Sequence, residues 1–300
     1  MKFAACLGVK DEIELIRPAI AHLRSIGVDH IIASDAHSAD GTSEVLAELA
    51  RGTDFEHVFF DDRTSEPGHE AAADADIMDR ARAAGADWLI FADADEFPLP
   101  RSGQLRDVAA LASADALTIN RYNVPLLASG PALRLPVGGL DDVLLYAPDE
   151  NRFAIQTRIR NDAEAPWIGV IPAPKMMVRL DRVETIGEGH HVLGSGAGLT
   201  SEVPDDLIIA HVPFSTTSRF ARKVTNIRAQ YAAIGHQWGP DTAWHWRRWL
   251  DNVAQRGGVA GEMARNRVTV DELAKLHQIG VIRTAAEILG LTKPGRQGMR

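Results

Sequence analysis

Residues 88–97 read WLIFADADEF, five apolar residues that run directly into three carboxylates. A short apolar run of this kind predicts a buried strand over residues 88–92. Asp93 and Asp95 follow two positions apart, so both side chains can project together once the chain leaves the sheet. Paired carboxylates suit Mg²⁺ or Mn²⁺, which prefer hard oxygen ligands. The alternative interpretation of the same residues is a solvated acidic turn.

Predicted strands and helices alternate on the N-terminal side of this stretch. Strands are expected over residues 2–9, 28–34, 55–60 and 88–92, and helices over 12–25, 40–51 and 70–84. Such alternation is typical of an α/β fold with a doubly wound, mostly parallel sheet and helices on both faces. Gly27 and Gly85 each follow a predicted helix, where glycine commonly ends one.

The rest of the chain is less regular. Residues 101–210 predict mixed strands and long loops, with apolar runs at 116–119, 143–146 and 176–180 and a last strand at 207–211. Beyond it, an apolar stripe from Phe220 to Tyr231 predicts a helix, and two more are expected at 243–254 and 270–289. We therefore expect a helical C-terminal extension.

The predicted strands end in carboxylates. Asp11 and Glu12 follow the first, Asp35 the second, the pair at 61–62 the third, and Asp93 and Asp95 the fourth. Ligands of doubly wound sheets bind beyond the carboxyl ends of the strands. Acidic groups on one rim repel each other unless positive charge lies among them. A divalent cation is the simplest source of that charge.

Charge is distributed unevenly along the 300 residues, whose formal net charge is −9. Residues 215–300 hold 14 Lys+Arg and 6 Asp+Glu, so this segment is basic at +8 while residues 1–214 are acidic at −17. We expect a catalytic domain over 1–214 and a basic helical extension over 215–300. The extension could complement the acidic part, bind a phosphate group, or make peripheral membrane contact. The acidic total argues against nucleic-acid binding.

The composition indicates a globular protein of a reducing compartment. Hydrophobic residues make up 45% and charged residues 24% of the chain. A single cysteine excludes an intrachain disulfide framework. No apolar run approaches the roughly 18 residues of a membrane helix, and the N-terminal run is short for a signal peptide. We expect a cytoplasmic protein in which Cys6, inside a buried strand, is unreactive.

Several short motifs occur in order along the chain: Lys10-Asp11-Glu12, His22, Gly27-Val28-Asp29-His30, Asp35, Ser38, Asp40-Gly41-Thr42, the segment 86–97, His211, Pro213, Ser215, Phe220 and Lys223. Together they resemble family-2-type glycosyltransferases, in particular the subgroup with KNE…LGVDH…S.DGT…DxDEF motifs. The match is close over residues 1–100 and looser over 172–224. The subgroup prefers Asn where this chain has Asp11, and often has Asn where it has His37.

This resemblance implies a GT-A fold and metal-dependent sugar transfer with inversion, as is usual for the family-2 type. The donor would be a UDP-, GDP- or dTDP-sugar, the acceptor a hydroxyl of a carbohydrate or lipid-linked molecule, and the metal Mn²⁺ or Mg²⁺. Carried over to this sequence, Asp35 would contact the base or ribose, Asp93 the ribose or metal, and Asp95 the metal. Asp11 and Glu12 of the first motif are assigned to donor binding.

Other candidates complete this hypothetical site. His191 and His211 are candidates for a further metal ligand, as related folds use a late histidine, and a structural role is the alternative for both. Asp142 is preferred over Asp141 and Glu150 as general base, although an exposed loop acid would look the same. Lys223, with Arg219 and Arg222, lies where a cation could reach the pyrophosphate.

One lysine and a group of three tryptophans each allow two interpretations. Lys175 could meet a phosphate or be exposed. The tryptophans at 244, 246 and 249 could dock a helix or contact a membrane interface.

Rival functions remain open at this point. A sugar-nucleotide pyrophosphorylase would usually show a Gly-rich loop with a basic residue after the first strand, where this chain has LGVKDE. A glycosidase needs two carboxylates across a cleft, which the sequence does not indicate. A non-catalytic nucleotide-binding protein is the third alternative.

Overall fold

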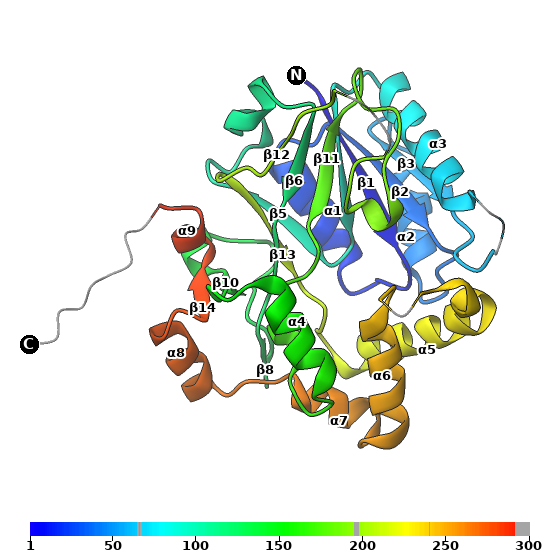
Figure 1. Ribbon diagram of the computed structural model, residues 1–300. Helices are drawn as coiled ribbons and strands as arrows, with labels where there is room; N and C mark the ends of the chain where they lie inside the picture. The colour runs from blue at the N-terminus through cyan, green and yellow to red at the C-terminus, as the bar shows by residue number, and fades with distance from the viewer. Residues whose placement is uncertain (65, 67, 195–197, 240, 292–300) are drawn as a thin grey trace, which may run out of the picture.

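A seven-stranded sheet forms the centre of the computed structural model, which describes residues 1–64, 66, 68–194, 198–239 and 241–291 (Figure 1). Its strands are parallel except that β11 runs antiparallel to both of its neighbours, β4 and β6. The order is β12 (Ser201–Glu202), β6 (Ala116–Ile119), β11 (Lys175–Arg179), β4 (Trp88–Asp93), β1 (Phe3–Val9), β2 (His30–Asp35) and β3 (Phe55–Phe59). The predicted α/β fold with a mostly parallel sheet is confirmed.

Helices cover both faces of this sheet because side chains of a strand alternate between its faces. Phe3, Ala5 and Leu7 of β1 pack with helices α1 (Ile16–Ser25) and α2 (Thr42–Leu49). Ala4 and Cys6 pack on the other side with α3 (His69–Ala83). Burial raises the pKa of the Cys6 thiol, which agrees with the prediction that it is unreactive.

A second, three-stranded sheet brings distant segments together at the end of β4. Strand β13 (Leu207–His211) lies between β5 (Glu96–Pro100), to which it is antiparallel, and β7 (Arg121–Asn123), to which it is parallel. The register sets His211 opposite Glu96 on one side and Asn123 on the other. This pairing places His211 directly beside the segment that carries Asp95.

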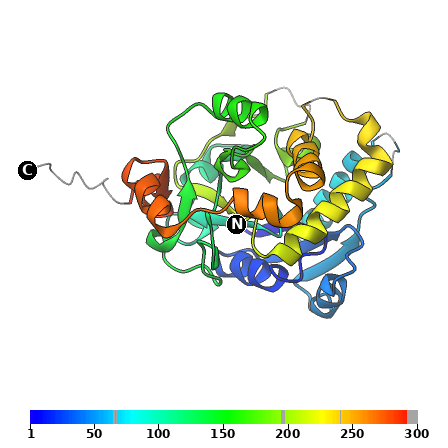
Figure 2. The same ribbon diagram turned by 90° about the horizontal axis from the view of Figure 1, so that it is seen from below.

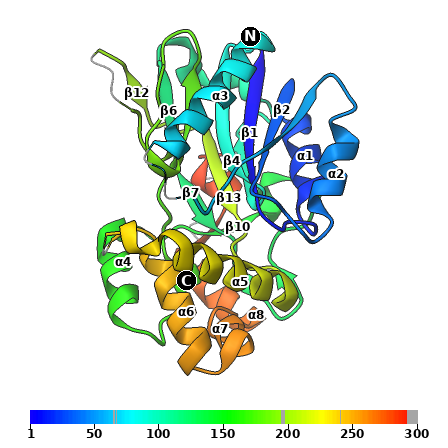
Figure 3. The same cartoon turned by 90° about the vertical axis from the view of Figure 1, so that its right-hand side faces the viewer.

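Helices of the C-terminal part lie beneath the carboxyl ends of the central strands (Figure 3). Figure 2 shows α5 in yellow beside α6 and α7 in orange. Trp249 packs against Trp167, Phe214 and Phe220, and Trp244 is buried in the same apolar cluster, so these two tryptophans dock the helices onto the body. The helices are α4 (Arg152–Asn161), α5 (Thr217–Ile234), α6 (Trp244–Gln255), α7 (Gly258–Arg265), α8 (Val270–Gln278) and α9 (Ala285–Ile288).

Short elements complete the described chain. The strands are β8 (Leu126–Leu127), β9 (Gly130–Pro131), β10 (Leu144–Tyr146) and β14 (Ile282–Thr284), and the 3₁₀ turns are η1 (Leu105–Asp107), η2 (Ala109–Ala112), η3 (Leu140–Asp142), η4 (Trp167–Gly169), η5 (Glu188–His190) and η6 (Gly235–Gln237). No helix of the described residues is long and apolar enough to cross a membrane.

Two predicted helices differ from the structure. The helix expected over 12–25 begins at Ile16, because Asp11 has a left-handed φ of 53° and the following residues form turns. The helix expected over 270–289 is wrong as a single element. Gly280, with φ of 75°, follows the end of α8, and β14 then pairs with β10 before α9 begins. Residues of the predicted extension thus share a sheet with residues 144–146.

Candidate active site

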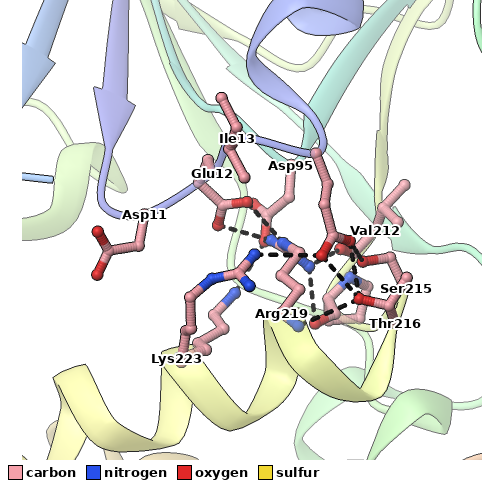
Figure 4. A network of polar contacts seen from close by, with 12 residues as sticks. Asp11, Glu12, Ile13, Asp95, Val212, Ser215, Thr216, Arg219 and Lys223 are labelled. Atoms are coloured by element: carbon pink, nitrogen blue, oxygen red, sulfur yellow. Dashed lines mark hydrogen bonds and ion pairs between the residues drawn. The ribbon is translucent and has the colours of Figure 1, made fainter. Parts of the chain in front are cut away.

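The carboxyl ends of β1 and β4 lie side by side, and helix α5 passes beneath them (Figure 3). Glu12 follows β1 and Asp95 follows β4, whereas Arg219 and Lys223 stand one turn apart on α5 and so share a face of that helix. The four side chains converge (Figure 4). Basic side chains of the protein therefore supply positive charge among the carboxylates at this edge of the sheet.

Arg219 is the centre of a buried ion network. Its Nε donates to Glu12 Oε2 at 2.5 Å and its Nη2 donates to Asp95 Oδ2 at 2.7 Å. Lys223 Nζ donates to the same Asp95 oxygen at 2.8 Å. Arg219 is 1% exposed and Asp95 4%, so these charges interact where the effective dielectric constant is low. The network joins α5 to the ends of two central strands.

Asp95 remains ionised in this environment. Burial by itself favours the neutral acid, but the charges of Lys223 and Arg219 hold the pKa of Asp95 well below its usual range. Both of these cations contact Oδ2. The other oxygen, Oδ1, accepts no hydrogen bond from the described residues, and His211 Nε2 lies 3.7 Å from it. Asp95 thus offers one uncommitted anionic oxygen.

His211 turns a bare ring nitrogen toward that oxygen. The Asn123 amide is fixed because its Nδ2 donates to the carbonyls of Ile168 and Val170, so its Oδ1 must accept from His211 Nδ1 at 2.7 Å. The ring proton is therefore on Nδ1. Nε2 keeps its lone pair and lies 3.7 Å from Asp95 Oδ1, too far for a hydrogen bond. Burial, opposed by Asp95, lowers the pKa of His211 to about 3, so the ring is neutral.

His191 has the same tautomer for a similar reason. Its Nδ1 lies 2.7 Å from the carbonyl oxygen of Pro174, which can only accept, so Nε2 again carries the lone pair. Burial, helped by the charges of Lys175 and Arg121, lowers the pKa of His191 to about 4. A histidine that donates from one nitrogen and leaves the other bare is prepared as a metal ligand.

Asp93 and Glu96 each pair with a buried cation. Lys175 Nζ lies 3.2 Å from Asp93 Oδ2, and Arg121 pairs with Glu96, whose Oε2 accepts from the main-chain nitrogen of Asp93 at 3.0 Å. The Asp93 side chain is 46% exposed, which makes it the accessible carboxylate of the pair. Lys175 is only 3% exposed, so the expectation of an exposed lysine is wrong, and phosphate contact stays a prediction.

Asp35, expected to contact the nucleotide, is fully buried. Its Oδ1 accepts from the main-chain nitrogen of Ser38 at 2.8 Å, and its Oδ2 lies against the Ser43 hydroxyl and 3.1 Å from His57 Nε2. These contacts shape the loop 36–40, which in turn holds Asp11 through a 2.6 Å hydrogen bond from the main-chain nitrogen of Ala39. Any effect of Asp35 on a ligand therefore passes through this loop.

Asp142, the preferred general base, is not brought to this rim. It ends η3, which packs against α9 and β14, and these elements lie on the opposite side of the view from α5 (Figure 1). The Asp142 side chain is exposed, and no hydrogen bond or ion pair within the described ranges links it to Asp93 or Asp95. The pairing of β10 with β14 explains this, because it holds the segment beside α9.

Glu70, Asp74 and His190 place three ligand atoms within 4.8 Å of one another. They already bond among themselves and to the loop. His190 Nε2 lies 2.8 Å from Asp74 Oδ1, and Glu70 Oε1 accepts from the main-chain nitrogen of Gly189 at 2.8 Å. The His190 ring also stacks on Phe91 of β4, with 4.3 Å between ring centroids. These contacts anchor the segment that presents His191.

Sequence reasoning missed two residues that hold the side chains of the site in place. Arg121 and Asn123 belong to a short strand with no recognisable motif, and their only signal is that polar residues stand between apolar runs. Arg219 and Lys175 were noticed as cations, but their carboxylate partners could not be named, since each pair joins segments far apart in sequence.

No protein-family model matches the chain, and no curated protein matches it. Among solved structures, the chain is similar to residues 1–349 of S. aureus TarS in complex with UDP, at 12% identity and a TM-score of 0.41, over 94% of this chain and 79% of that one. A longer TarS chain matches at 13% identity and a TM-score of 0.40, over 77% of this chain but only 39% of its own length.

Glucosyl-3-phosphoglycerate synthase from Mycobacterium tuberculosis, in complex with phosphoglyceric acid, is also similar. The identity is 15% and the TM-score 0.36, over 78% of this chain and 80% of that chain. These likenesses are distant, and the function proposed below rests on the geometry of the site.

Proposed function

We propose that this protein is a glycosyltransferase of the GT-A type that moves a sugar from a nucleotide-sugar donor to an acceptor hydroxyl, with inversion at the anomeric carbon. The observation that carries the proposal is the pairing of His211 Nε2 with Asp95 Oδ1. Two electron-pair donors face each other 3.7 Å apart at the carboxyl end of the sheet, where doubly wound folds bind their ligands. Arg219 and Lys223 compensate the charge of Asp95 at Oδ2, and a cation on the other side would bind Oδ1 and Nε2 together.

The residues of the rim fit a divalent cation, Mn²⁺ or Mg²⁺. Asp95 Oδ1 and His211 Nε2 have no hydrogen-bond donor within the described residues. Asp93 of the same segment has an accessible carboxylate, and His191 leaves its Nε2 without a hydrogen bond. No three of these four residues place their ligand atoms within 4.8 Å of one another in the described parts of the chain, so we propose Asp95 and His211 as the pair that would hold the ion, with Asp93 and His191 as further ligands once it binds. A metal bound here would act as a Lewis acid that stabilises charge on the leaving diphosphate.

The basic side chains of the rim suit the donor's diphosphate. Lys223 is more accessible than Arg219, since its side chain is 25% exposed against 1% while both hold Asp95. Lys175 adds a second ammonium group next to Asp93. Fixed cations that await the developing negative charge lower the barrier because they need no reorganisation during the reaction. The nucleoside would lie against Asp11, Glu12 and the loop whose shape Asp35 fixes.

A thermal-shift and product assay tests this proposal. UDP-, GDP- and dTDP-sugars are each added with and without Mn²⁺, since a ligand that binds the native state raises the melting temperature. We expect one nucleotide class to stabilise the protein only with Mn²⁺, and slow release of nucleoside diphosphate and free sugar. Release of a nucleoside triphosphate when diphosphate is added would instead indicate a pyrophosphorylase.

A matched pair of variants sharpens the test. Lys223→Ala should weaken binding of the nucleoside diphosphate more than binding of the nucleoside, whereas Lys275→Ala, which removes an exposed lysine of α8, should change neither. Equal losses for nucleoside and diphosphate would contradict the assignment of Lys223. Absence of any Mn²⁺-dependent nucleotide binding in the wild type would overturn the proposed function.

A further inference from the structure

A cavity of about 450 Å³ lies between α4 and α6, two helices that lie side by side (Figure 3). Trp244 and Asn252 line it from α6, about two helical turns apart, and both side chains are buried. The residues that line this cavity do not include any of the candidate active site. The cavity therefore needs an explanation of its own.

Arginine dominates the lining of this cavity. Among the described residues it contains Arg160 of α4, Arg247 and Arg248 of α6, Arg256 directly after α6, and one acid, Asp251. Four guanidinium groups and one carboxylate give the lining a formal charge of +3. Each guanidinium is a planar fork of N–H donors that matches the oxygens of an anion.

Arg248 is a fixed, buried part of this site. It is 8% exposed, and its Nη2 donates to the main-chain oxygens of Asp162 at 3.3 Å and Ala163 at 3.1 Å. Its Nε and Nη1 have no hydrogen-bond partner within the described residues, and Glu262 Oε1 lies 3.9 Å from Nη1. Burial lowers the pKa of Arg248, because desolvation disfavours its charge. An anion in the cavity would stabilise that charge.

Two of the other arginines pair with acids that water reaches easily. Arg160 Nη1 lies 2.5 Å from Asp241 Oδ1, and Arg256 Nη1 lies 2.7 Å from Glu164 Oε1. The Asp241 side chain is 84% exposed and that of Glu164 63%. Exposed ion pairs of this kind contribute little to stability, so an incoming anion can replace the carboxylate at small cost.

We propose that this cavity binds the phosphate group of a phosphate-bearing molecule. A phosphate monoester carries a charge of about −1.5 to −2 and three acceptor oxygens, so it can bond to several guanidinium groups at once. A carboxylate offers one charge and two oxygens, which matches this lining less well. The inference does not depend on the proposed sugar transfer, because it uses no residue of the rim. Sugar phosphates and phospholipid headgroups both carry the required group.

Calorimetry and vesicle sedimentation test the proposal on the full chain, in EDTA so that no metal contributes. The soluble probes are inorganic phosphate and glucose 6-phosphate, and the vesicles are phosphatidylcholine with or without phosphatidic acid. The test variant is Arg160→Gln/Arg256→Gln. The control is Arg17→Gln/Arg24→Gln, which removes two arginines of α1 that also pair with exposed acids, so the net charge changes equally.

We expect the test variant to bind phosphate about tenfold or more weakly than the control, since the loss of one charge-assisted hydrogen bond costs at least about that factor. Asp251→Asn should bind phosphate more tightly than the wild type, because the substitution removes the acid of the lining. Lys223→Ala, a variant of the rim, should bind inorganic phosphate in the cavity as the wild type does.

The two kinds of probe distinguish the sources of the phosphate group. Binding of glucose 6-phosphate without sedimentation would identify a soluble ligand, whereas sedimentation with phosphatidic acid that the test variant loses would identify a lipid headgroup. Equal affinities of the two double variants for the probe that binds would overturn the proposal. Failure of the wild type to bind any of these probes saturably would overturn it as well.

Discussion

Arg219 and Asp95, 124 positions apart in the sequence, form a buried ion pair with 2.7 Å between Nη2 and Oδ2. The pair joins helix α5 to the end of β4, and Arg219 also holds Glu12 beyond β1. One guanidinium thus gathers two acidic motifs that the sequence separates. It also occupies Asp95 Oδ2, which leaves Oδ1 to face His211.

Replacing Asp95 by Asn should destabilise the protein. The sequence favours the opposite expectation, because removing a carboxylate from a crowded acidic rim relieves repulsion. In the structure the substitution leaves the cations of Arg219 and Lys223 with less compensation. Breaking a buried ion pair costs roughly 3–5 kcal/mol, and since Glu12 still pairs with Arg219 we expect about 3 kcal/mol. Urea unfolding measures this, with the exposed Asp61→Asn as control, and increased stability would contradict it.

Stability should fall as the pH is lowered from about 6.5 toward 4 in the metal-free protein. The folded-state pKa is about 4 for His191 and about 3 for His211 and His245, all below the ordinary value of 6.5. The unfolded chain therefore binds protons in this range that the folded chain does not, and acid favours unfolding. For buried His211 the slope approaches about 1.4 kcal/mol per pH unit.

Urea unfolding at pH 7, 6 and 5 checks this dependence. His211→Gln should flatten the slope, because that position no longer titrates. A wild-type stability that does not change over the range would show that the three rings do not stay neutral in the folded protein.

Asn123→Ala should weaken Mn²⁺ binding although Asn123 is not itself a proposed ligand. Its Oδ1 fixes the ring proton of His211 on Nδ1 and so leaves Nε2 free for the metal. Loss of such a supporting hydrogen bond typically lowers metal affinity about 10–100-fold. Water-proton relaxation during a Mn²⁺ titration measures the affinity, and Asn161→Ala at the exposed end of α4 is the control. Equal affinities in the three proteins would rule out a role for His211 in the metal site.

A chain cut after Ala243 should lose its cooperative melting transition. The cut removes Trp249 from Trp167 and Phe214, and it removes β14 from its pairing with β10. The newly exposed apolar surface would favour aggregation. Differential scanning calorimetry of both chains tests this. A stable truncated protein that no longer sediments with anionic liposomes, unlike the full chain, would support the membrane interpretation of the basic segment.

The local pattern was sufficient for the N-terminal part of the fold. Periodicity and apolar runs predicted β1, β2, β3 and β4 and the three helices between them, with ends shifted by a few residues. The segment at 207–211 was also predicted correctly as a strand. These elements signal themselves because their apolar residues recur at the period of the structure they form.

The same signal failed where neighbours decide the structure. Residues 282–284 read as part of a helix, but they pair with β10, and only the partner strand and the turn at Gly280 determine this. Helices α4 and α7 went unpredicted, and Asp142 was chosen as a base from a segment whose position in the fold the sequence could not show.

For the site, the sequence by itself determined which acidic residues lie at strand ends, since strand boundaries follow from local patterning and parallel strands end on one edge. It also singled out Asp93, Asp95, His191 and His211 as chemically suited to a metal. Only the tertiary structure decided the protonation state of those groups and the direction in which their ligand atoms point. The tautomer of His211 depends on Asn123, and the free oxygen of Asp95 depends on Arg219 and Lys223. Such contacts join segments remote in sequence, and the burial that makes them strong arises only when the whole chain packs.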